Sequence, residues 1–354
     1  MHKILVAGGA GYVGSVLAHE LLERGYAVRV LDRLYYGDHG LADLRDRVEV
    51  VVTDMRCVEP AHLAGVTAVI NLGGLSNDPT AEYNPAANYE INTVAALRLA
   101  ELARAAGVRR YILASSCSIY DLGGADDRRD VLFDEQTVVH PCAPYATSKY
   151  DAEQRLLAMA GPEFVPLCLR KGTVYGLSPR LRFDLVVNTF VRDALTTGTI
   201  TLVRGGEMWR PLVAVRDVAR AYVASLAADE ALVSGQVFNV ASCNMRISEL
   251  ALRVRTTLRD LGVAVDIRPD YAERSVRSYR VSSEKIERVL GFKPLVSVED
   301  AVRELVQHLR RGSVSGLSDP RYENLRWLRL LEETEAARGS GRSVFDMPPD
   351  ESAP

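Results

Sequence analysis

The first 32 residues constrain the fold more strongly than any other stretch of the chain. Ile4 to Ala7 is a short apolar run typical of a buried parallel strand, and glycines follow at positions 8, 11 and 14. The next residues have helical spacing of apolar side chains, and a second apolar run from Ala27 to Leu31 ends in Asp32. This order of strand, glycine-rich turn, helix, strand and acid is the one that a dinucleotide-binding unit requires.

The glycines and the acid have distinct physical roles in such a unit. Gly8 permits a tight turn, Gly11 lets the backbone approach a pyrophosphate at the helix N-terminus, and Gly14 lets the helix pack closely on the strand. Asp32, at the tip of the second strand, is placed to bind both ribose hydroxyls, and its carboxylate would repel a 2′-phosphate. The sequence therefore predicts NAD rather than NADP, although the cation of Arg33 beside the acid weakens that preference.

The composition excludes several classes of protein. A net charge of −3 over 354 residues gives no general attraction to nucleic acid or to an anionic membrane. No apolar run approaches the ~20 residues of a membrane span, and the first strand begins too early to leave room for a signal peptide. The five cysteines are scattered and form no C-x-x-C pair, so we expect free thiols in a cytoplasmic protein, with neither a metal site nor a disulfide.

Further strand-like runs alternate with helical stretches along the chain. These runs are Val48–Val52, Ala68–Leu72, Tyr111–Ser115 and Val165–Leu169. The alternation predicts an α/β fold, a doubly wound parallel sheet of the Rossmann type with helices on both faces. Because ligands of such sheets bind beyond the C-terminal ends of the strands, the residues directly after each run are candidate site residues.

Two of these positions, and one in a helix, have two interpretations each. Asp54 could accept a hydrogen bond from the adenine amine, or it could cap a helix. Gly73 and Gly74 would let the backbone approach a cofactor, or they could form a plain loop. Asn92 lies among apolar residues of a long helix expected from Pro85 to about residue 106, and a buried asparagine needs partners. We favour a place near the active site for Asn92 over a role in helix packing.

The residues after Tyr111–Ser115 predict the chemical centre. Ser116 follows directly, and about thirty residues later Pro144 opens a helix with Tyr145 and Lys149 four residues apart, hence on one face. A tyrosine near its free pKa of ~10 is a poor base at neutral pH. The Lys149 ammonium would lower that pKa, so that Tyr145 could exchange protons with a sugar hydroxyl or ketone while Ser116 hydrogen-bonds the same oxygen. Because Tyr145 and Lys149 follow a dinucleotide-binding unit and a serine at a strand end, we favour a catalytic role for them over an exposed pair on a helix surface.

Taken together, the glycines at 8–14, Asp32, Ser116 and the Tyr145/Lys149 pair resemble the extended short-chain dehydrogenase/reductases. Within them, the chain looks like the nucleotide-sugar epimerases and dehydratases, from residue 3 to about residue 310. The resemblance implies that Tyr145 is the base, that Ser116 is its hydrogen-bonding partner, and that Lys149 holds the nicotinamide ribose. It also implies a nucleotide diphosphate sugar as substrate, and a homodimer formed through the helices at 85–106 and 146–160.

The expected site residues fall into two groups. Those expected to bind the cofactor are Gly8, Gly11, Tyr12, Val13, Asp32, Arg33, Asp54, Met55, Leu72, Gly73, Gly74, Asn92, Ser115, Tyr145 and Lys149. Those expected to bind the substrate are Ser76, Ser116, Cys117, Ser118, Thr173, Asn188, Arg210, Arg274 and Arg277. The resemblance places Arg210 against the diphosphate, where bidentate arginine pairing is physically suited, and makes Arg274 or Arg277 either a second cation there or a solvated surface residue.

Two departures from the family pattern bear on the reaction. Dehydratases carry an Asp-Glu pair directly after the catalytic Ser or Thr, where this chain has Cys117 and Ser118. A thiol and a hydroxyl do not readily replace two carboxyls in acid–base elimination, so 4,6-dehydration is disfavoured. Family members usually place an asparagine before Val-Tyr-Gly, and Thr173 stands there instead. The expected substrate–phosphate contact therefore lacks its usual residue.

These observations predict the domain organisation and the function. We expect a Rossmann domain over residues 1–176, to which 212–241 returns, and a smaller mixed α/β substrate-binding cap over 177–211 and 242–334. Ser248 is expected to cap a helix in that cap, and 335–354 to be a disordered tail. The expected function is NAD-dependent epimerisation of a nucleotide-activated sugar, with C4 the first guess. The alternatives are a ketoreductase that uses NAD(P)H once and, less favoured, a 4,6-dehydratase or a non-catalytic dinucleotide sensor.

Overall fold

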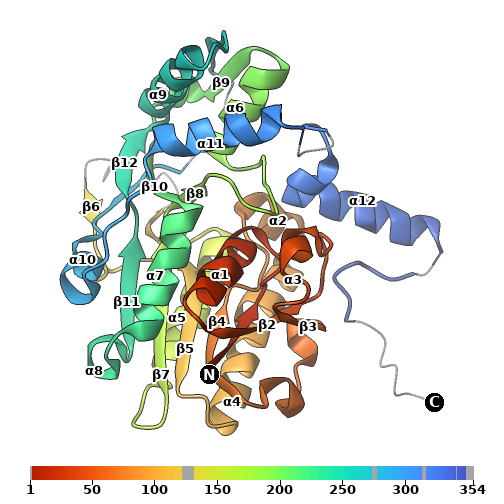
Figure 1. The fold of residues 1–354 in the computed structure, drawn as a ribbon, viewed down its shortest axis with the longest axis vertical. Coiled ribbons are helices and arrows are strands. Elements are labelled where there is room, and N and C mark those ends of the chain that lie inside the picture. Colours follow the sequence, from red (N-terminus) through yellow and green to blue (C-terminus); the bar gives the residue numbers. More distant parts are fainter. Residues whose placement is uncertain (1, 122–130, 273–276, 313–315, 340, 348–354) are drawn as a thin grey trace.

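The computed structural model describes residues 2–121, 131–272, 277–312, 316–339 and 341–347, and its centre is a seven-stranded sheet (Figure 1). The strand order is β11–β7–β5–β4–β1–β2–β3, and every neighbouring pair is parallel. The strands are β1 (Lys3–Ala7), β2 (Ala27–Asp32), β3 (Glu49–Val52), β4 (Val66–Asn71), β5 (Arg110–Ser116), β7 (Val165–Lys171) and β11 (Gln236–Val240). Because the order reverses between β1 and β4, the sheet is doubly wound, and the predicted fold class is confirmed.

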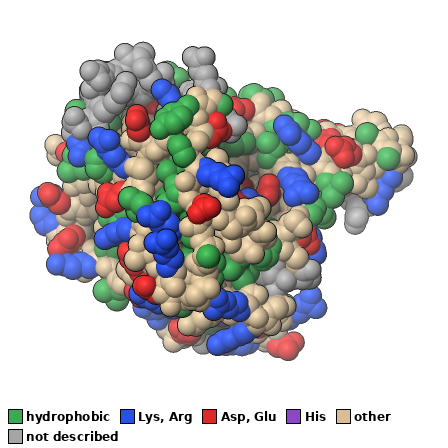
Figure 2. All heavy atoms as spheres, turned by 90° about the horizontal axis from the view of Figure 1, so that it is seen from above, with side chains coloured by type: hydrophobic (Ala, Val, Ile, Leu, Met, Phe, Trp, Pro, Cys, Tyr) green, Lys and Arg blue, Asp and Glu red, His purple; other side chains and the backbone are tan. Residues whose placement is uncertain are grey.

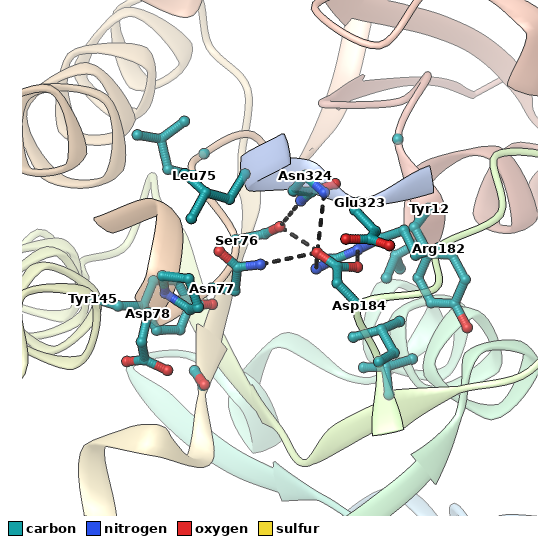
Figure 3. A pocket seen from close by; sticks show the side chains of 18 of the residues that line it. Tyr12, Leu75, Ser76, Asn77, Asp78, Tyr145, Arg182, Asp184, Glu323 and Asn324 are labelled. Carbon is teal, nitrogen blue, oxygen red and sulfur yellow. Dashed lines mark hydrogen bonds and ion pairs between the residues drawn. The ribbon is translucent and has the colours of Figure 1, made fainter. Parts of the chain in front are cut away.

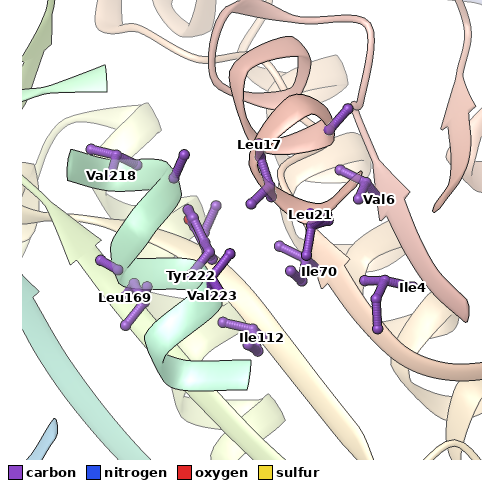
Figure 4. Close-up of a cluster of buried hydrophobic side chains, with 14 of the residues drawn as sticks. Ile4, Val6, Leu17, Leu21, Ile70, Ile112, Leu169, Val218, Tyr222 and Val223 are labelled. Atoms are coloured by element: carbon purple, nitrogen blue, oxygen red, sulfur yellow. The ribbon is translucent and has the colours of Figure 1, made fainter. Parts of the chain in front are cut away.

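Helices cover both faces of this sheet because successive strand residues point to opposite sides. On one face, α1 (Tyr12–Glu23) and α7 (Val215–Ala227) pack together over Ile4, Val6 and Ile112 of the strands (Figure 4). On the other face, α4 (Ala96–Ala105) and α5 (Pro144–Leu157) cover the alternate strand residues, such as Leu5, Val69 and Leu113. These strand side chains are at most 2% exposed, and each buried one contributes about 1.5–3 kcal/mol.

The helix expected from Pro85 to residue 106 is confirmed as one unbroken helical stretch, which ends at Ala105 and contains a π-helical turn. It comprises α3 (Pro85–Tyr89), a π-helical turn over Glu90–Ala95, and α4. Asn92 lies in the π-helical turn, and its amide donates to the Leu75 carbonyl (3.0 Å) and accepts from the Leu75 amide (2.8 Å). The widened turn accompanies this contact with the loop after β4, and such turns are frequent at functional sites.

A smaller set of elements lies at the C-terminal end of the main strands (Figure 1). It contains a three-stranded sheet of β8 (Thr173–Tyr175), β10 (Trp209–Ala214) and β12 (Cys243–Arg246). The helices α6 (Val186–Thr196), α9 (Ile247–Asp260) and α11 (Val298–Arg310) share one apolar core with it. Two short parallel pairs complete the set, β9 (Thr199–Val203) with β13 (Asp266–Asp270) and β6 (Leu132–Phe133) with β14 (Arg280–Val281).

The remaining described helices are short, apart from the C-terminal one. They are η1 (His39–Leu44), η2 (Met55–Cys57), η3 (Pro60–Leu63), α2 (Asp78–Tyr83), η5 (Cys117–Tyr120), η6 (Arg204–Gly206), α8 (Glu230–Val233), α10 (Glu284–Leu290), η7 (Pro320–Tyr322) and α12 (Asn324–Ala337). Across the part of the chain that the structure describes, no helix is both long enough and apolar enough to cross a membrane. Figure 2 shows the face at the top of Figure 1, where basic and acidic side chains are interspersed.

Three expectations about the C-terminal half differ from the structure. Of the segment 212–241, α7 and β11 pack in the main domain, whereas β10 belongs to the smaller sheet. Ser248 is not a cap, because α9 begins at Ile247, one residue before it. Residues 341–347 lie against the domain: Phe345 is 4% exposed, and its backbone carbonyl accepts a 2.8 Å hydrogen bond from Arg56. The first residues of the expected tail, 335–337, belong to α12, and residues 340 and 348–354 lie outside the described residues.

Candidate active site

A cavity of about 1390 Å³ opens beyond the C-terminal ends of the main strands. It runs from the glycine-rich loop after β1, past the ends of β2, β4 and β5, to β7 and the smaller sheet. This volume exceeds the ~300–1,000 Å³ of an ordinary small-molecule pocket, so a dinucleotide and a second ligand can lie side by side in it. It also lies where doubly wound sheets bind their ligands.

The three glycines of the loop meet different surroundings. Gly8 has φ +73°, and a Cβ there would lie 2.7 Å from the backbone nitrogen of Gly73. A Cβ on Gly14 would lie 2.6 Å from the Cα of Gly9, so the fold itself requires glycine at both positions. A Cβ on Gly11 would meet only the Gly8 carbonyl, at 3.2 Å, and the remaining space belongs to the cavity. The loop therefore forms an open backbone cradle, which fits a pyrophosphate.

Asp32 lies at the tip of β2 and lines the cavity, as a ribose-binding acid must. Its carboxylate accepts the backbone N–H groups of Ala10 (3.0 Å) and Leu34 (2.8 Å), which fixes its orientation toward the glycine-rich loop. Burial raises the pKa of Asp32. The charge of the neighbouring Arg33 is already paired, because its guanidinium forms an ion pair with the Asp54 carboxylate at 2.6 Å. This geometry removes the objection that Arg33 raised against NAD.

Asp54 caps the short helix η2, which was one of the two roles that the sequence left open for it. Its side chain accepts the backbone N–H of Arg56 at 2.8 Å and forms an ion pair with the Arg56 guanidinium, also at 2.8 Å. Burial opposes ionisation, but these bonds hold the pKa of Asp54 below its ordinary value. Its carboxylate still lines the cavity, beside a group of predicted cofactor residues. That group is Tyr12, Val13, Met55, Leu72, Gly73 and Gly74.

At the other end of the cavity, Tyr145 in the first turn of α5 lies beside Ser116 at the end of β5, and the Ser116 side chain acts to lower the pKa of the phenol. The structure thus brings together the two residues that were expected to share the reacting oxygen. Lys149, one turn further along α5, also lines the cavity and is 4% exposed. A Cβ on Gly74 would lie 3.2 Å from its Nζ, so the loop after β4 leaves just enough room for this side chain.

The pKa of Tyr145 was expected to be lowered by Lys149, but in the structure it is raised. Burial, and then the carboxylate of Asp78, raise the pKa of Tyr145 to about 12, while Ser116 and Arg277 act in the opposite direction. Burial also lowers the pKa of Lys149 to about 8. The physical reason is desolvation, which disfavours the charged form of both groups and is the largest influence on each pKa.

Six of the expected substrate residues line the cavity, and two others that the structure describes, Cys117 and Asn188, do not reach it. Ser76, Ser118, Thr173, Arg210 and Arg277 line it together with Ser116. Cys117 is fully buried with its Sγ 3.1 Å from the Arg170 carbonyl, and Asn188 bonds the backbone N–H (2.9 Å) and carbonyl (3.2 Å) of Gly176. Arg274 lies outside the described residues.

Of the expected cofactor residues, Asn92 and Ser115 also stay outside the cavity lining. Asn92 lies behind the loop after β4 and holds that loop in place through two hydrogen bonds to the backbone of Leu75. Ser115 is fully buried, because the alternation of β5 turns it away from the side that Ser116 occupies. Asn92 therefore lies near the active site, as favoured from the sequence, whereas Ser115 follows the strand into the core although it is next to Ser116 in sequence.

Two features of the site were missed by the sequence reasoning. Lys171, the last residue of β7, lines the cavity and donates to the Ser115 carbonyl at 3.1 Å; the rule of inspecting strand ends could have found it. Burial, and then the Lys149 charge, lower the pKa of Lys171 to about 7. The start of α12 also walls the cavity, through Glu323, Asn324 and Arg326 among others. No sequence signal indicated it, because the resemblance ends near residue 310.

A polar network joins three chain segments across the cavity (Figure 3). The Asp184 carboxylate accepts hydrogen bonds from the Asn77 side chain (3.0 Å) and from the backbone N–H of Asn324 (3.1 Å). The Ser76 hydroxyl accepts from Arg182 (3.1 Å) and from the Asn324 side chain (2.9 Å). The loop after β4, the segment before α6 and the start of α12 are therefore tied together over the site.

Comparisons with known proteins agree with this geometry. Residues 4–241 match the NAD dependent epimerase/dehydratase family. The chain is similar to a putative UDP-glucose 4-epimerase of Methanocaldococcus jannaschii, 26% identical over 320 residues, 88% of this chain and 99% of that protein. It is 28% identical over 337 residues to UDP-glucose 4-epimerase of Mycolicibacterium smegmatis, with 88% and 99% covered. The solved structure of MoeE5 with UDP-glucuronic acid and NAD has a TM-score of 0.74 at 26% identity, covering 88% and 99% of the two chains. MoeE5 is also known with UDP-glucose and NAD.

Proposed function

Because the chain belongs to the NAD-dependent epimerase/dehydratase family, with NAD as its cofactor, we propose that it epimerises a nucleotide-activated sugar. The observation that carries the proposal is the convergence of Ser116 and Tyr145 at one end of a cavity whose other end fits NAD. Directly after Ser116, where elimination would need carboxyls, the chain has a buried thiol and a hydroxyl. This combination favours oxidation followed by reduction over dehydration.

In the proposed reaction Tyr145 transfers the proton, while Ser116 and Lys149 bind and orient the reactants. Bound NAD would supply a hydride acceptor that returns the hydride, and a cationic ring that favours a nearby phenolate. Tyr145 removes the proton of the sugar hydroxyl as the carbon is oxidised, and it returns a proton when the ketone is reduced. Ser116 hydrogen-bonds the same oxygen and keeps it in line with the phenol. Lys149, whose pKa burial lowers to about 8, is still positively charged most of the time at neutral pH and would donate to the nicotinamide ribose.

The substrate class is supported by the relatives and by one half-buried cation. The two curated relatives are named as UDP-glucose 4-epimerases, and MoeE5 binds UDP-sugars. Arg210 lines the cavity, and its guanidinium lies 5.7 Å from the ring centroid of Tyr279. A guanidinium held in this way is suited to a diphosphate. We therefore take a UDP-sugar as the first substrate class and C4 as the first carbon to test.

The test is turnover without added cofactor. Purified protein is incubated with a panel of nucleotide sugars, and the products are identified by NMR. The proposal expects two C4 epimers to interconvert with no consumption of NADH, and it expects Tyr145→Phe to lose turnover while keeping bound NAD. Stoichiometric consumption of NADH would instead identify a ketoreductase, and a 4-keto-6-deoxy product would identify a dehydratase.

A further inference from the structure

Two buried polar atoms beside Tyr145 lack a hydrogen-bond partner within the described part of the chain. They are Oδ1 of Asp78 and Nη1 of Arg277. Asp78 begins α2, directly after the loop that follows β4, and Arg277 lies just before β14. The two side chains form an ion pair through their other atoms, Oδ2 and Nη2, and both line the cavity. A buried donor and a buried acceptor are thus held in one ion pair, and each can still form a hydrogen bond with a ligand.

The position of this pair places it at the sugar end of the cavity. Figure 3 shows the Asp78 carboxylate close to Tyr145. The Asp78 and Arg277 charges both act on the Tyr145 phenol, the first raising its pKa and the second lowering it. Arg277 therefore does not fit the expected role of a second diphosphate cation, because its charge is neutralised by Asp78 beside the reacting group. Arg210 remains as the cation for the diphosphate.

We propose that the Asp78–Arg277 pair recognises the sugar ring and selects a neutral sugar over a uronic acid. The inference rests on the proposed function, because it takes a nucleotide sugar as the substrate. A carboxylate oxygen only accepts a hydrogen bond, and a guanidinium nitrogen only donates one. A sugar hydroxyl can do both, so hydroxyls satisfy both unpaired atoms.

A sugar carboxylate fits this pair poorly. It has no proton to donate to Asp78 Oδ1, and it brings a second negative charge next to the Asp78 carboxylate, most of whose surface is buried. Arg277 cannot compensate fully, because Asp78 already neutralises it. The pair therefore discriminates between the two sugar types that MoeE5 accommodates, UDP-glucose and UDP-glucuronic acid.

The test measures binding rather than turnover. The full-length protein is loaded with NAD and carries Tyr145→Phe so that no reaction occurs. Dissociation constants for UDP, UDP-glucose and UDP-glucuronic acid are measured by calorimetry, with Asp78 intact and as Asp78→Asn. We expect UDP-glucose to bind at least tenfold tighter than UDP-glucuronic acid. In Asp78→Asn, this preference should fall at least tenfold while the affinity for UDP stays the same.

The control is Glu333→Gln, which removes a carboxylate from the cavity wall on α12 and should leave the preference unchanged. Bound NAD and the melting temperature verify the fold of each variant. Equal or tighter binding of UDP-glucuronic acid with Asp78 intact would overturn the inference without any variant. An unchanged preference in a folded Asp78→Asn protein would also overturn it. If neither sugar nor UDP binds, the proposed function fails and the inference fails with it.

Discussion

The side-chain amide of Asn324 donates a 2.9 Å hydrogen bond to the hydroxyl of Ser76, 248 residues earlier in the chain. Through this bond, and through the bond from its backbone to Asp184, the first turn of α12 is tied to the two segments that border the cavity. The curated relatives described above are matched over 99% of their own length but over only 88% of this chain. The family model matches residues 4–241, so this part of the cavity wall is built from residues beyond that match.

We predict that Asn324→Ala weakens the retention of NAD. Removing the side chain breaks the bond to Ser76. It also leaves the buried guanidinium of Arg180, which donates to the Asn324 side-chain oxygen Oδ1 at 2.8 Å, without that partner. We expect NAD to dissociate about tenfold faster, a change of about 1.4 kcal/mol. The measurement is the rate of NAD loss into an excess of a competing scavenger. Arg338→Ala, at the exposed end of α12, is the matched control. An unchanged rate in Asn324→Ala would show that α12 does not hold the cofactor.

Gly11→Ala should separate cofactor binding from folding. The added Cβ meets only the Gly8 carbonyl, at 3.2 Å, but it projects into the cradle that a pyrophosphate would fill. We expect the melting temperature to change little, and the affinity for NAD to fall by at least tenfold. Gly161→Ala, where a Cβ meets nothing within 4 Å, serves as the control. Wild-type NAD affinity in Gly11→Ala would place the pyrophosphate elsewhere.

The sequence predicted those parts of the fold and site that depend on local patterns. The strand, glycine turn, helix and acid of residues 4–32 are local, and so are the four-residue spacing of Tyr145 and Lys149 and the strand end at Ser116. The structure brings Ser116 and Tyr145 together and places Lys149 beside the same cavity. Each of these features depends on a short stretch of sequence, where the spacing of apolar residues and the residues of the turn decide the geometry.

The features that were missed depend on contacts between distant segments. Asn92 and Asn188 each bond a backbone segment of another element, and a buried amide in the sequence does not reveal its partner. The Asp78–Arg277 pair joins residues about 200 positions apart. The pKa of Tyr145 was predicted to fall, but it rises because desolvation depends on how closely the cavity walls approach, which spacing along the chain does not contain.

The buried pair of Glu153 and Arg170 predicts a large stability effect. Glu153 is fully buried on α5, its Oε2 accepts from the Arg170 Nε at 3.0 Å, and Arg170 also donates to the Tyr120 hydroxyl at 2.7 Å. Glu153→Gln leaves the Arg170 charge buried and uncompensated, which should lower the free energy of unfolding by about 3–5 kcal/mol. Urea unfolding measures this loss.

The control for that experiment lies two residues earlier on α5. Asp151 accepts a 2.6 Å hydrogen bond from the exposed Tyr89 hydroxyl, so Asp151→Asn should cost less than about 1 kcal/mol. Equal losses for the two variants would mean that the buried pair contributes no more to stability than the surface contact.

Lys171 predicts a pH dependence of stability with a definite sign. Its pKa is about 7 in the folded protein, against the ordinary 10.5, so between these values the unfolded chain binds more protons than the folded one. The free energy of unfolding therefore rises with pH across that window, by up to about 1.4 kcal/mol per pH unit. Lys171→Met should be more stable than wild type near pH 6.5 and should show a shallower rise from pH 7.

Urea unfolding at several pH values tests this prediction. Lys293→Met, at an exposed lysine, is the control and should keep the wild-type slope. If Lys171→Met also kept that slope, then Lys171 would be charged in the folded protein throughout this range, and its amine would be better solvated than its burial indicates.

The most direct test of the central claim follows the hydrogen on the carbon that is inverted. A nucleotide sugar carrying deuterium at C4 is incubated with the purified protein in ordinary water, without added NAD, and the product is analysed by NMR and mass spectrometry. If Tyr145 handles only the hydroxyl proton and the carbon-bound hydrogen is removed and returned within the site, the C4 epimer keeps all of its deuterium. Replacement of the deuterium by solvent hydrogen would show that the carbon is inverted by proton abstraction, and would contradict the account.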